Sequence, residues 1–113
     1  EAIGAATLRL DGFVCLAASS RPGTVVTRPF RLAGDKLLVN VQGARFRVDV
    51  LNRKGEPIPE FSGGQSTRYR GVDELRLSPT WKNPAGLSAL KGRVVRLKFH
   101  LQNARLYSFH VPK

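Results

Sequence analysis

The chain has 113 residues, of which 42% are hydrophobic, and this suits one globular domain with its own core. Nineteen Lys and Arg residues against eight Asp and Glu residues give it a formal net charge of +11. This composition excludes a disordered chain, and no stretch of the sequence approaches the ~20 apolar residues of a membrane span. The charge excess favours a polyanionic partner, although it could also serve solubility alone.

Short strand-like segments follow one another along the chain, separated by turn residues. We predict strands at 7–10, 12–17, 23–29, 36–42, 44–51, 73–78, 92–102 and 104–111. Gly, Pro, Asn and Asp mark the turns between them at 21–23, 33–35, 42–43 and 52–55. No segment has sustained helical periodicity. The pattern predicts an all-β fold, an antiparallel β-sandwich formed by residues 1–113 as one domain.

Basic residues alternate with apolar residues inside two of these segments. In 94–101, Val95, Leu97, Phe99 and Leu101 alternate with Arg96, Lys98 and His100. In 44–51, Phe46, Val48 and Val50 alternate with Arg45, Arg47 and Asp49. Successive side chains of a strand point to opposite faces, so each segment should bury its apolar set and expose its charged set. If the strands share a sheet, its open face is strongly basic. The alternative is an ordinary solvated face with cross-strand charge pairs.

Two longer segments, 55–67 and 79–86, contain several Pro and Gly residues and should form surface loops, where binding residues often lie. Trp81 could stack on a sugar ring or a base from the second loop; alternatively it fills the core, with its indole N–H bonded to a carbonyl. Tyr69 lies between Arg68 and Arg70, which indicates either a cationic patch around an aromatic ring or a solvated loop.

Catalytic and metal-binding patterns are weak. The single cysteine, Cys15, lies in an apolar run and should be a buried, unreactive thiol. His100 and His110 fall in separate strands, without a His or Cys partner at metal-ligand spacing. The adjacent pair Asp73-Glu74 would point to opposite faces of a strand and cannot form a glycosidase acid pair. We therefore expect no enzyme activity of this chain alone, no metal and no cofactor.

Several phrases, taken in order, resemble a C-terminal β-sandwich domain of secreted bacterial glycosidase-like proteins. Those proteins carry a five-bladed β-propeller related to invertase, levanase and arabinanase. The matching phrases lie at 10–14, 27–30, 37–41, 55–59, 87–93, 95–99 and 106–109. The resemblance implies a jelly-roll-like fold, export from the cell and an accessory, carbohydrate-binding role. The segment 62–70, expected to be acidic in that pattern, is basic here and favours a sulfated or uronate-bearing glycan. The start at Glu1, without Met, suggests a domain excised from a larger secreted enzyme.

The sequence thus predicts a non-catalytic carbohydrate-binding module that holds an appended glycoside hydrolase on an anionic polysaccharide. Thirteen of the nineteen basic residues are arginine, whose guanidinium binds sulfate or carboxylate through two parallel hydrogen bonds. The expected binding residues are Arg47, Arg70, Arg76, Arg96, Lys98, Tyr69 and Trp81. One alternative is a structural domain that packs on the catalytic propeller of the same polypeptide. Single-stranded nucleic acid is a less favoured partner, and no membrane contact is expected.

Overall fold

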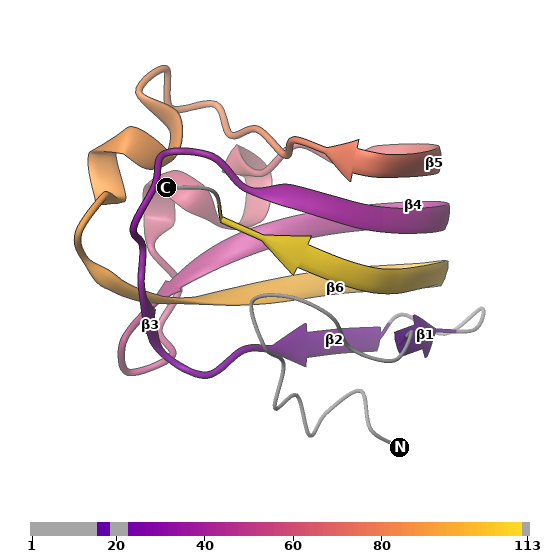
Figure 1. Ribbon diagram of the computed structural model, residues 1–113, viewed down its shortest axis with the longest axis horizontal. Helices are drawn as coiled ribbons and strands as arrows, with labels where there is room; N and C mark the ends of the chain where they lie inside the picture. The colour runs from indigo at the N-terminus through magenta and orange to yellow at the C-terminus, as the bar shows by residue number, and fades with distance from the viewer. Residues whose placement is uncertain (1–15, 19–22, 112–113) are drawn as a thin grey trace.

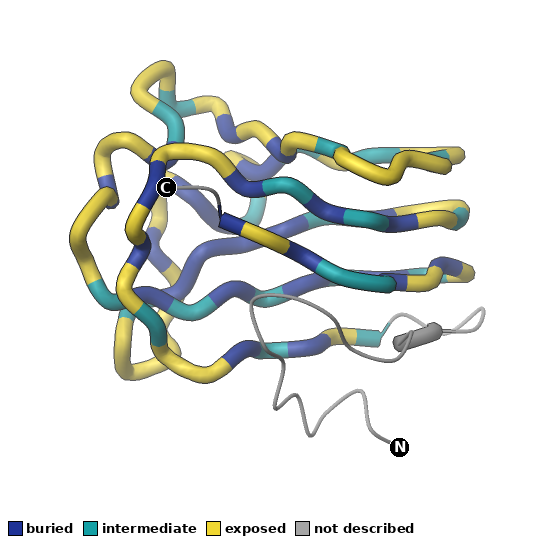
Figure 2. The backbone as a smooth tube through the Cα atoms, in the orientation of Figure 1, coloured by how far each residue is buried: buried dark blue, intermediate teal, exposed yellow. Residues whose placement is uncertain are grey.

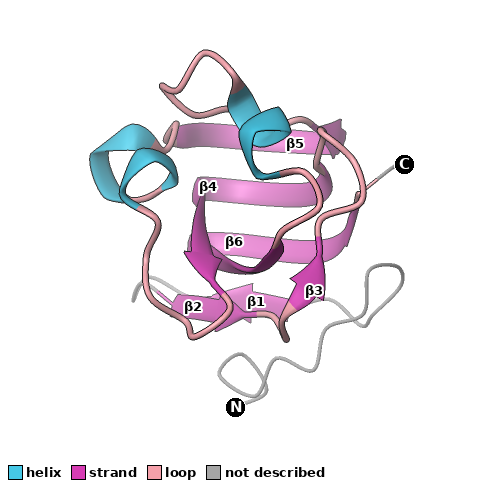
Figure 3. Ribbon diagram, turned by 90° about the vertical axis from the view of Figure 1, so that its left-hand side faces the viewer, coloured by secondary structure: helices cyan, strands magenta, loops and turns pink. Residues whose placement is uncertain are grey.

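The computed structural model describes residues 16–18 and 23–111, which form an all-β, antiparallel fold, as predicted (Figure 1). The strands are β1 (Leu16–Ala18), β2 (Gly23–Val26), β3 (Phe30–Arg31), β4 (Leu38–Asn52), β5 (Tyr69–Leu77) and β6 (Val94–His110). Short 3-10 helices occupy the loops: η1 (Pro59–Phe61), η2 (Gly63–Gln65) and η3 (Gly86–Leu90). Figure 3 shows the helices at one end of the strands. No helix of the described residues is long and apolar enough to cross a membrane.

The two longest strands, β4 and β6, form the centre of a single hydrogen-bonded sheet. They pair with each other along almost their whole length, β5 pairs with the outer edge of β4, and β1, β2 and β3 pair with the outer edge of β6. Each long strand covers two segments that the sequence predicted as separate strands. The predicted breaks between strands near 42–43 and 102–104 are therefore wrong. The chain bends at these positions, but each strand continues through the bend.

Both bends occur at the same point of the pairing between β4 and β6. Gly43 lies opposite Ala104, and a Cβ built on Gly43 would fall 2.2 Å from the Ala104 Cα atom. Gly43 also has a φ of +147°, and Asn103 has a φ of +46°. Only glycine allows both that backbone conformation and that close approach. The bend folds both strands back over themselves, so that 38–42 and 104–110 form one layer and 44–52 and 94–102 form the other (Figure 1).

The core lies between the two layers. Phe99 of one layer contacts Phe109 of the other with ring centroids 5.2 Å apart, and Phe46 stacks on Phe99 at 6.1 Å. The predicted inward sets of both segments are indeed buried. Figure 2 shows buried and partly exposed residues alternating along β4 and β6, whereas β5 is mostly exposed. The alternation in the sequence therefore predicted the two faces correctly.

The edge of β4 beyond Phe46, where the pairing with β5 ends, is covered by the loops. The carbonyl of Val50 accepts hydrogen bonds from Ile58 N at 3.0 Å and from Ser62 Oγ at 2.9 Å. The carbonyl of Val48 accepts a hydrogen bond from the indole nitrogen of Trp81 at 3.0 Å. These bonds satisfy strand carbonyls that would otherwise be buried without partners. Cys15 and the predicted strand at 7–10 lie outside the described residues.

Candidate functional site

Arginines from two neighbouring strands gather on the outer face of the sheet, away from the core. Arg45 of β4 lies directly opposite Arg70 of β5 and, on its other side, opposite Gln102 of β6. Arg47 of β4 lies opposite His100 of β6. Arg68 precedes β5 by one residue and is two residues from Arg70. Successive side chains of a strand point to opposite faces, so the charged residues that alternate with buried apolar residues all lie on this outer face.

These side chains surround a surface hollow of about 200 Å³, which we call the arginine hollow. It is lined by Arg45, Phe46, Arg47, Arg68, Tyr69, Arg70, His100, Leu101 and Gln102. Arg45, Arg68 and Arg70 are exposed, and none of them forms an ion pair with a described carboxylate. Like charges directly opposite on a sheet destabilise the pair of strands. The uncompensated Arg45–Arg70 pair is therefore a local cost that an anionic ligand would offset.

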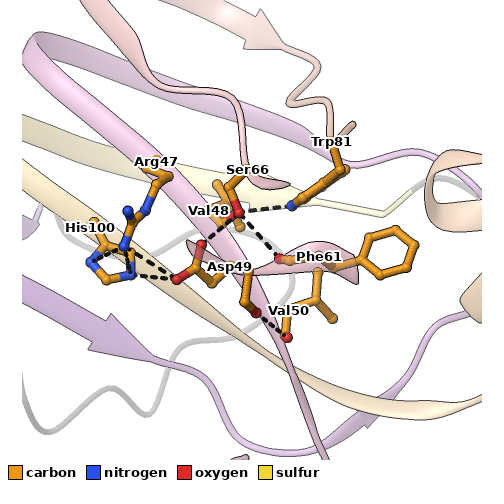
Figure 4. Close-up of polar contacts among 9 residues, drawn as sticks. Arg47, Val48, Asp49, Val50, Phe61, Ser66, Trp81 and His100 are labelled. Carbon is orange, nitrogen blue, oxygen red and sulfur yellow. Dashed lines mark hydrogen bonds and ion pairs between the residues drawn. The ribbon is translucent and has the colours of Figure 1, made fainter. Parts of the chain in front are cut away.

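One acidic group, Asp49, lies beside the arginine hollow and is almost fully buried. Its Oδ2 atom lies 2.9 Å from His100 Nε2 and 3.3 Å from Arg47 Nη2, and its Oδ1 atom accepts a hydrogen bond from Ser66 Oγ at 2.6 Å (Figure 4). Asp49 was predicted to point outward, and it does leave the core face. It is nevertheless only 6% exposed, because the loop carrying Ser66 covers it.

The pKa of Asp49 is lowered from its ordinary value. Burial alone raises the pKa, because it disfavours the charged form. The hydrogen bonds from His100 and Ser66, together with the positive charges of His100 and Arg47, outweigh that effect. Asp49 is therefore a stable anion that fixes the neighbouring cation, Arg47, at the floor of the arginine hollow.

Arg47 and His100 are held against each other by this carboxylate. Arg47 Nη2 lies 3.0 Å from His100 Nε2 and 3.3 Å from His100 Nδ1. Because Nε2 donates its hydrogen to Asp49, it has no lone pair for Arg47, and Nδ1 is the ring nitrogen that can accept a hydrogen bond from the guanidinium when the imidazole is neutral. The Nε atom of Arg47 is buried and has no hydrogen-bond acceptor among the residues that the structure describes. Arg47 is thus preorganised, whereas the other three arginines extend from the surface.

The cluster has the residue types of a hydrolase triad but not its connectivity. The carboxylate of Asp49 stands between the hydroxyl of Ser66 and the imidazole of His100, and no hydrogen bond joins these last two groups in the described structure. A serine nucleophile needs the imidazole next to its hydroxyl as a base. Among the described residues, no three His, Cys, Asp or Glu side chains form a group that could hold a metal ion.

The structure brings together only part of the predicted site. Arg47, Arg70 and Tyr69 line the arginine hollow, and Arg45, Arg68, His100 and Gln102 join them without having been predicted as binding residues. Arg76 lies six residues farther along β5, about 20 Å away at the rise of a strand. Arg96 is bound elsewhere, with its Nε atom donating to the Arg53 carbonyl at 3.0 Å. Lys98 shares the outer face, opposite Asp49, but does not line the hollow.

Of the two predicted aromatic binding residues, Trp81 lies in the core and Tyr69 lines the arginine hollow. Trp81 is only 8% exposed, packs on Phe61 with ring centroids 5.9 Å apart, and donates its indole hydrogen to the Val48 carbonyl. The prediction that its ring stacks on a ligand is therefore wrong, and the alternative of a core residue holds. The Tyr69 ring packs against Phe46 at 6.4 Å, and its hydroxyl accepts a hydrogen bond from Thr80 N at 3.1 Å. It forms part of the wall of the arginine hollow and is not a free stacking platform.

A second hollow, of about 270 Å³, lies near the start of β4. Its walls include Lys36, Leu37, Pro79 and Leu87, together with the edge of Trp81. It lacks the concentration of charge found in the arginine hollow. Comparison with known protein families, with curated proteins and with solved structures finds no match to this chain.

Proposed function

We propose that this domain is a non-catalytic binding module for an anionic, sulfated or uronate-bearing polysaccharide. The observation that carries the proposal is the arginine hollow, in which four guanidinium groups line one depression of about 200 Å³. Arginine presents a planar fork of donors that matches a sulfate or carboxylate group. Because Arg45, Arg47 and Arg70 project from paired strands, the spacing of their Cα atoms is fixed before a ligand arrives, and Asp49 also holds the Arg47 side chain in place, which lowers the entropic cost of binding.

The positions of the aromatic rings favour a glycan over single-stranded nucleic acid. Proteins that bind single strands combine a basic groove with exposed aromatic rings on which bases stack. Here the Trp81 ring is buried, and the Tyr69 ring packs on Phe46. In the part of the chain that the structure describes, no other tyrosine or tryptophan lines the arginine hollow. Hydrogen bonds and charge therefore supply the recognition, as a sulfated or carboxylated sugar requires.

The wider setting that we propose rests on the sequence resemblance alone. The ordered phrases imply a jelly-roll-like domain of a secreted protein, attached to a glycoside hydrolase in the same polypeptide. In that setting the domain would hold the enzyme on its polysaccharide. A domain that only packs on its catalytic partner would use the same basic face for a protein contact, and the glycan test below separates these two roles.

The test is a glycan array probed at about 50 and about 150 mM salt. Generic attraction between a basic protein and polyanions fades steeply over this range, whereas directional hydrogen bonds persist. We expect a subset of anionic glycans to be retained at the higher salt, and we expect Arg45→Gln with Arg70→Gln to lose them. The matched control is Arg76→Gln, which removes an exposed arginine from the same strand, β5, but outside the hollow. Absence of all retained binding, or equal loss in the control, would overturn the proposed function.

A further inference from the structure

We infer that the arginine hollow selects sulfate esters over uronate carboxylates, and that it takes a sugar residue carrying more than one sulfate group. This inference rests on the proposed function and narrows its ligand class. Three features support it: the excess positive charge at the hollow, the position of Arg45 directly opposite Arg70 on the neighbouring strand, and the fixed position of Arg47.

The charge balance calls for a multiply charged ligand. Four arginines line the hollow, and the one carboxylate that contacts any of them is Asp49, among the residues that the structure describes. Even with His100 neutral, this leaves an excess of three positive charges. A hollow of about 200 Å³ has room for about one sugar ring with its substituents. A uronate residue brings one negative charge to that space, whereas a disulfated residue brings two.

The arrangement of the donors suits a tetrahedral group better than a planar one. Arg45 and Arg70 lie directly opposite each other on neighbouring strands, so their Cβ atoms are about 5 Å apart. Two guanidinium groups can then approach one anionic group from two sides. A carboxylate has two oxygens in one plane, and a single guanidinium fork satisfies both. A sulfate ester has three terminal oxygens directed outward, which can accept hydrogen bonds from both arginines at once.

Arg47 supplies a guanidinium of fixed position beside these two exposed arginines. Its Nη2 atom is held by Asp49 and by contact with His100, and its side chain is only 20% exposed. No described residue accepts a hydrogen bond from its buried Nε–H group. Because Asp49 neutralises Arg47, the net positive potential of the hollow comes from Arg45, Arg68 and Arg70, and Arg47 contributes a guanidinium of fixed position. A sulfate ester remains ionised across the working pH range of proteins and can use this potential throughout.

Isothermal titration calorimetry at about 150 mM salt, with four ligands on one backbone, tests the inference. The ligands are cellotetraose, its C6-oxidised uronate form, its 6-sulfate form and a form with two sulfates per residue. The uronate and the 6-sulfate carry equal charge and differ in the geometry of the anionic group. A difference between their affinities therefore reflects that geometry and not the charge. We expect the 6-sulfate to bind about tenfold more tightly than the uronate, the disulfated form tighter still, and neutral cellotetraose not to bind.

The variant Arg45→Lys keeps the charge and removes the planar fork, so it separates geometry from electrostatics. It should weaken binding of both sulfated ligands about tenfold and leave uronate binding within about twofold. Arg76→Lys on β5 is the matched control and should change nothing. Equal affinity for the uronate and the 6-sulfate would overturn the inference and leave the proposed function standing. Failure of every charged ligand would overturn the proposed function itself. Full displacement of the sulfated ligand by single-stranded DNA would indicate nucleic acid as the ligand class and would contradict both.

Discussion

Replacing Asp49 by Asn removes the buried negative charge and keeps the shape of the side chain. The Asp49 side chain is 9% exposed, and its carboxylate accepts hydrogen bonds from Ser66 at 2.6 Å and from His100 at 2.9 Å, with Arg47 at 3.3 Å. Breaking a fully buried ion pair costs about 3–5 kcal/mol, and an exposed pair contributes about 0–1 kcal/mol. The partners of Asp49 are partly exposed, with 20% and 26% of the Arg47 and His100 side chains accessible. We therefore expect a loss of about 2 kcal/mol in the free energy of unfolding at pH 7.

The loss should also depend on pH in a defined direction. The pKa of Asp49 is lower in the folded protein than in the unfolded chain. Its contribution to stability is therefore complete above the unfolded pKa of about 3.9, and it is lost as the pH falls below that value through the folded pKa. Since Asn cannot titrate, the difference between wild type and Asp49→Asn should narrow below about pH 4.

Urea denaturation at a series of pH values measures both effects, and the midpoint of thermal unfolding should fall by about 8 °C at pH 7. The matched control is Glu74→Gln, which neutralises an exposed carboxylate of β5. Its effect should stay within about 0.5 kcal/mol. A stability difference for Asp49→Asn that does not change between pH 7 and pH 3 would refute the assignment of Asp49 as the buried anion of this cluster.

Two further substitutions test the fold. Gly43→Ala should cost about 3 kcal/mol, because the new Cβ would meet Ala104 and the φ of +147° disfavours any other residue; Gly64→Ala, with open space around it, should cost less than about 1 kcal/mol. Equal stability of the two variants in urea titrations would show that the backbones of β4 and β6 do not approach closely at Gly43. Trp81→Phe should cost about 1–3 kcal/mol by leaving the Val48 carbonyl without its donor, with no loss of glycan affinity in the folded variant. Reduced glycan affinity at unchanged stability would indicate that Trp81 contacts the ligand.

The faces of the sheet could be predicted from the sequence because they depend on local alternation. Val95, Leu97 and Phe99 are buried as expected, and Arg45 and Arg47 lie on the opposite face. The bends could not be predicted in the same way. A glycine inside a strand-like segment indicates either a turn or a close approach of two backbones, and only the partner strand decides between them. For Gly43 the partner is Ala104, sixty-one residues away in the chain.

The composition of the site depends on strand register, which the sequence leaves open. Arg45 and Arg70 become neighbours because β4 and β5 pair in one particular register, and a shift by one residue would place them on opposite faces. Alternation alone could have added Arg68 to the prediction, since it shares its parity with Arg70. The prediction for Trp81 was wrong for a different reason: a proline-flanked loop is typical of the surface, but this loop covers the edge of β4, where the indole nitrogen of Trp81 donates to the Val48 carbonyl.

The central claim is that the four arginines of the hollow bind the anionic groups of a glycan together. The most direct measurement is a two-dimensional NMR titration that follows the arginine Nε–H resonances as a sulfated oligosaccharide is added at about 150 mM salt. Our account predicts that the resonances of Arg45, Arg47, Arg68 and Arg70 shift together and saturate at one equivalent, while Arg31, Arg76 and Arg93 stay in place. Uniform small shifts of all arginines without saturation would mean diffuse attraction to a basic protein and would contradict the account.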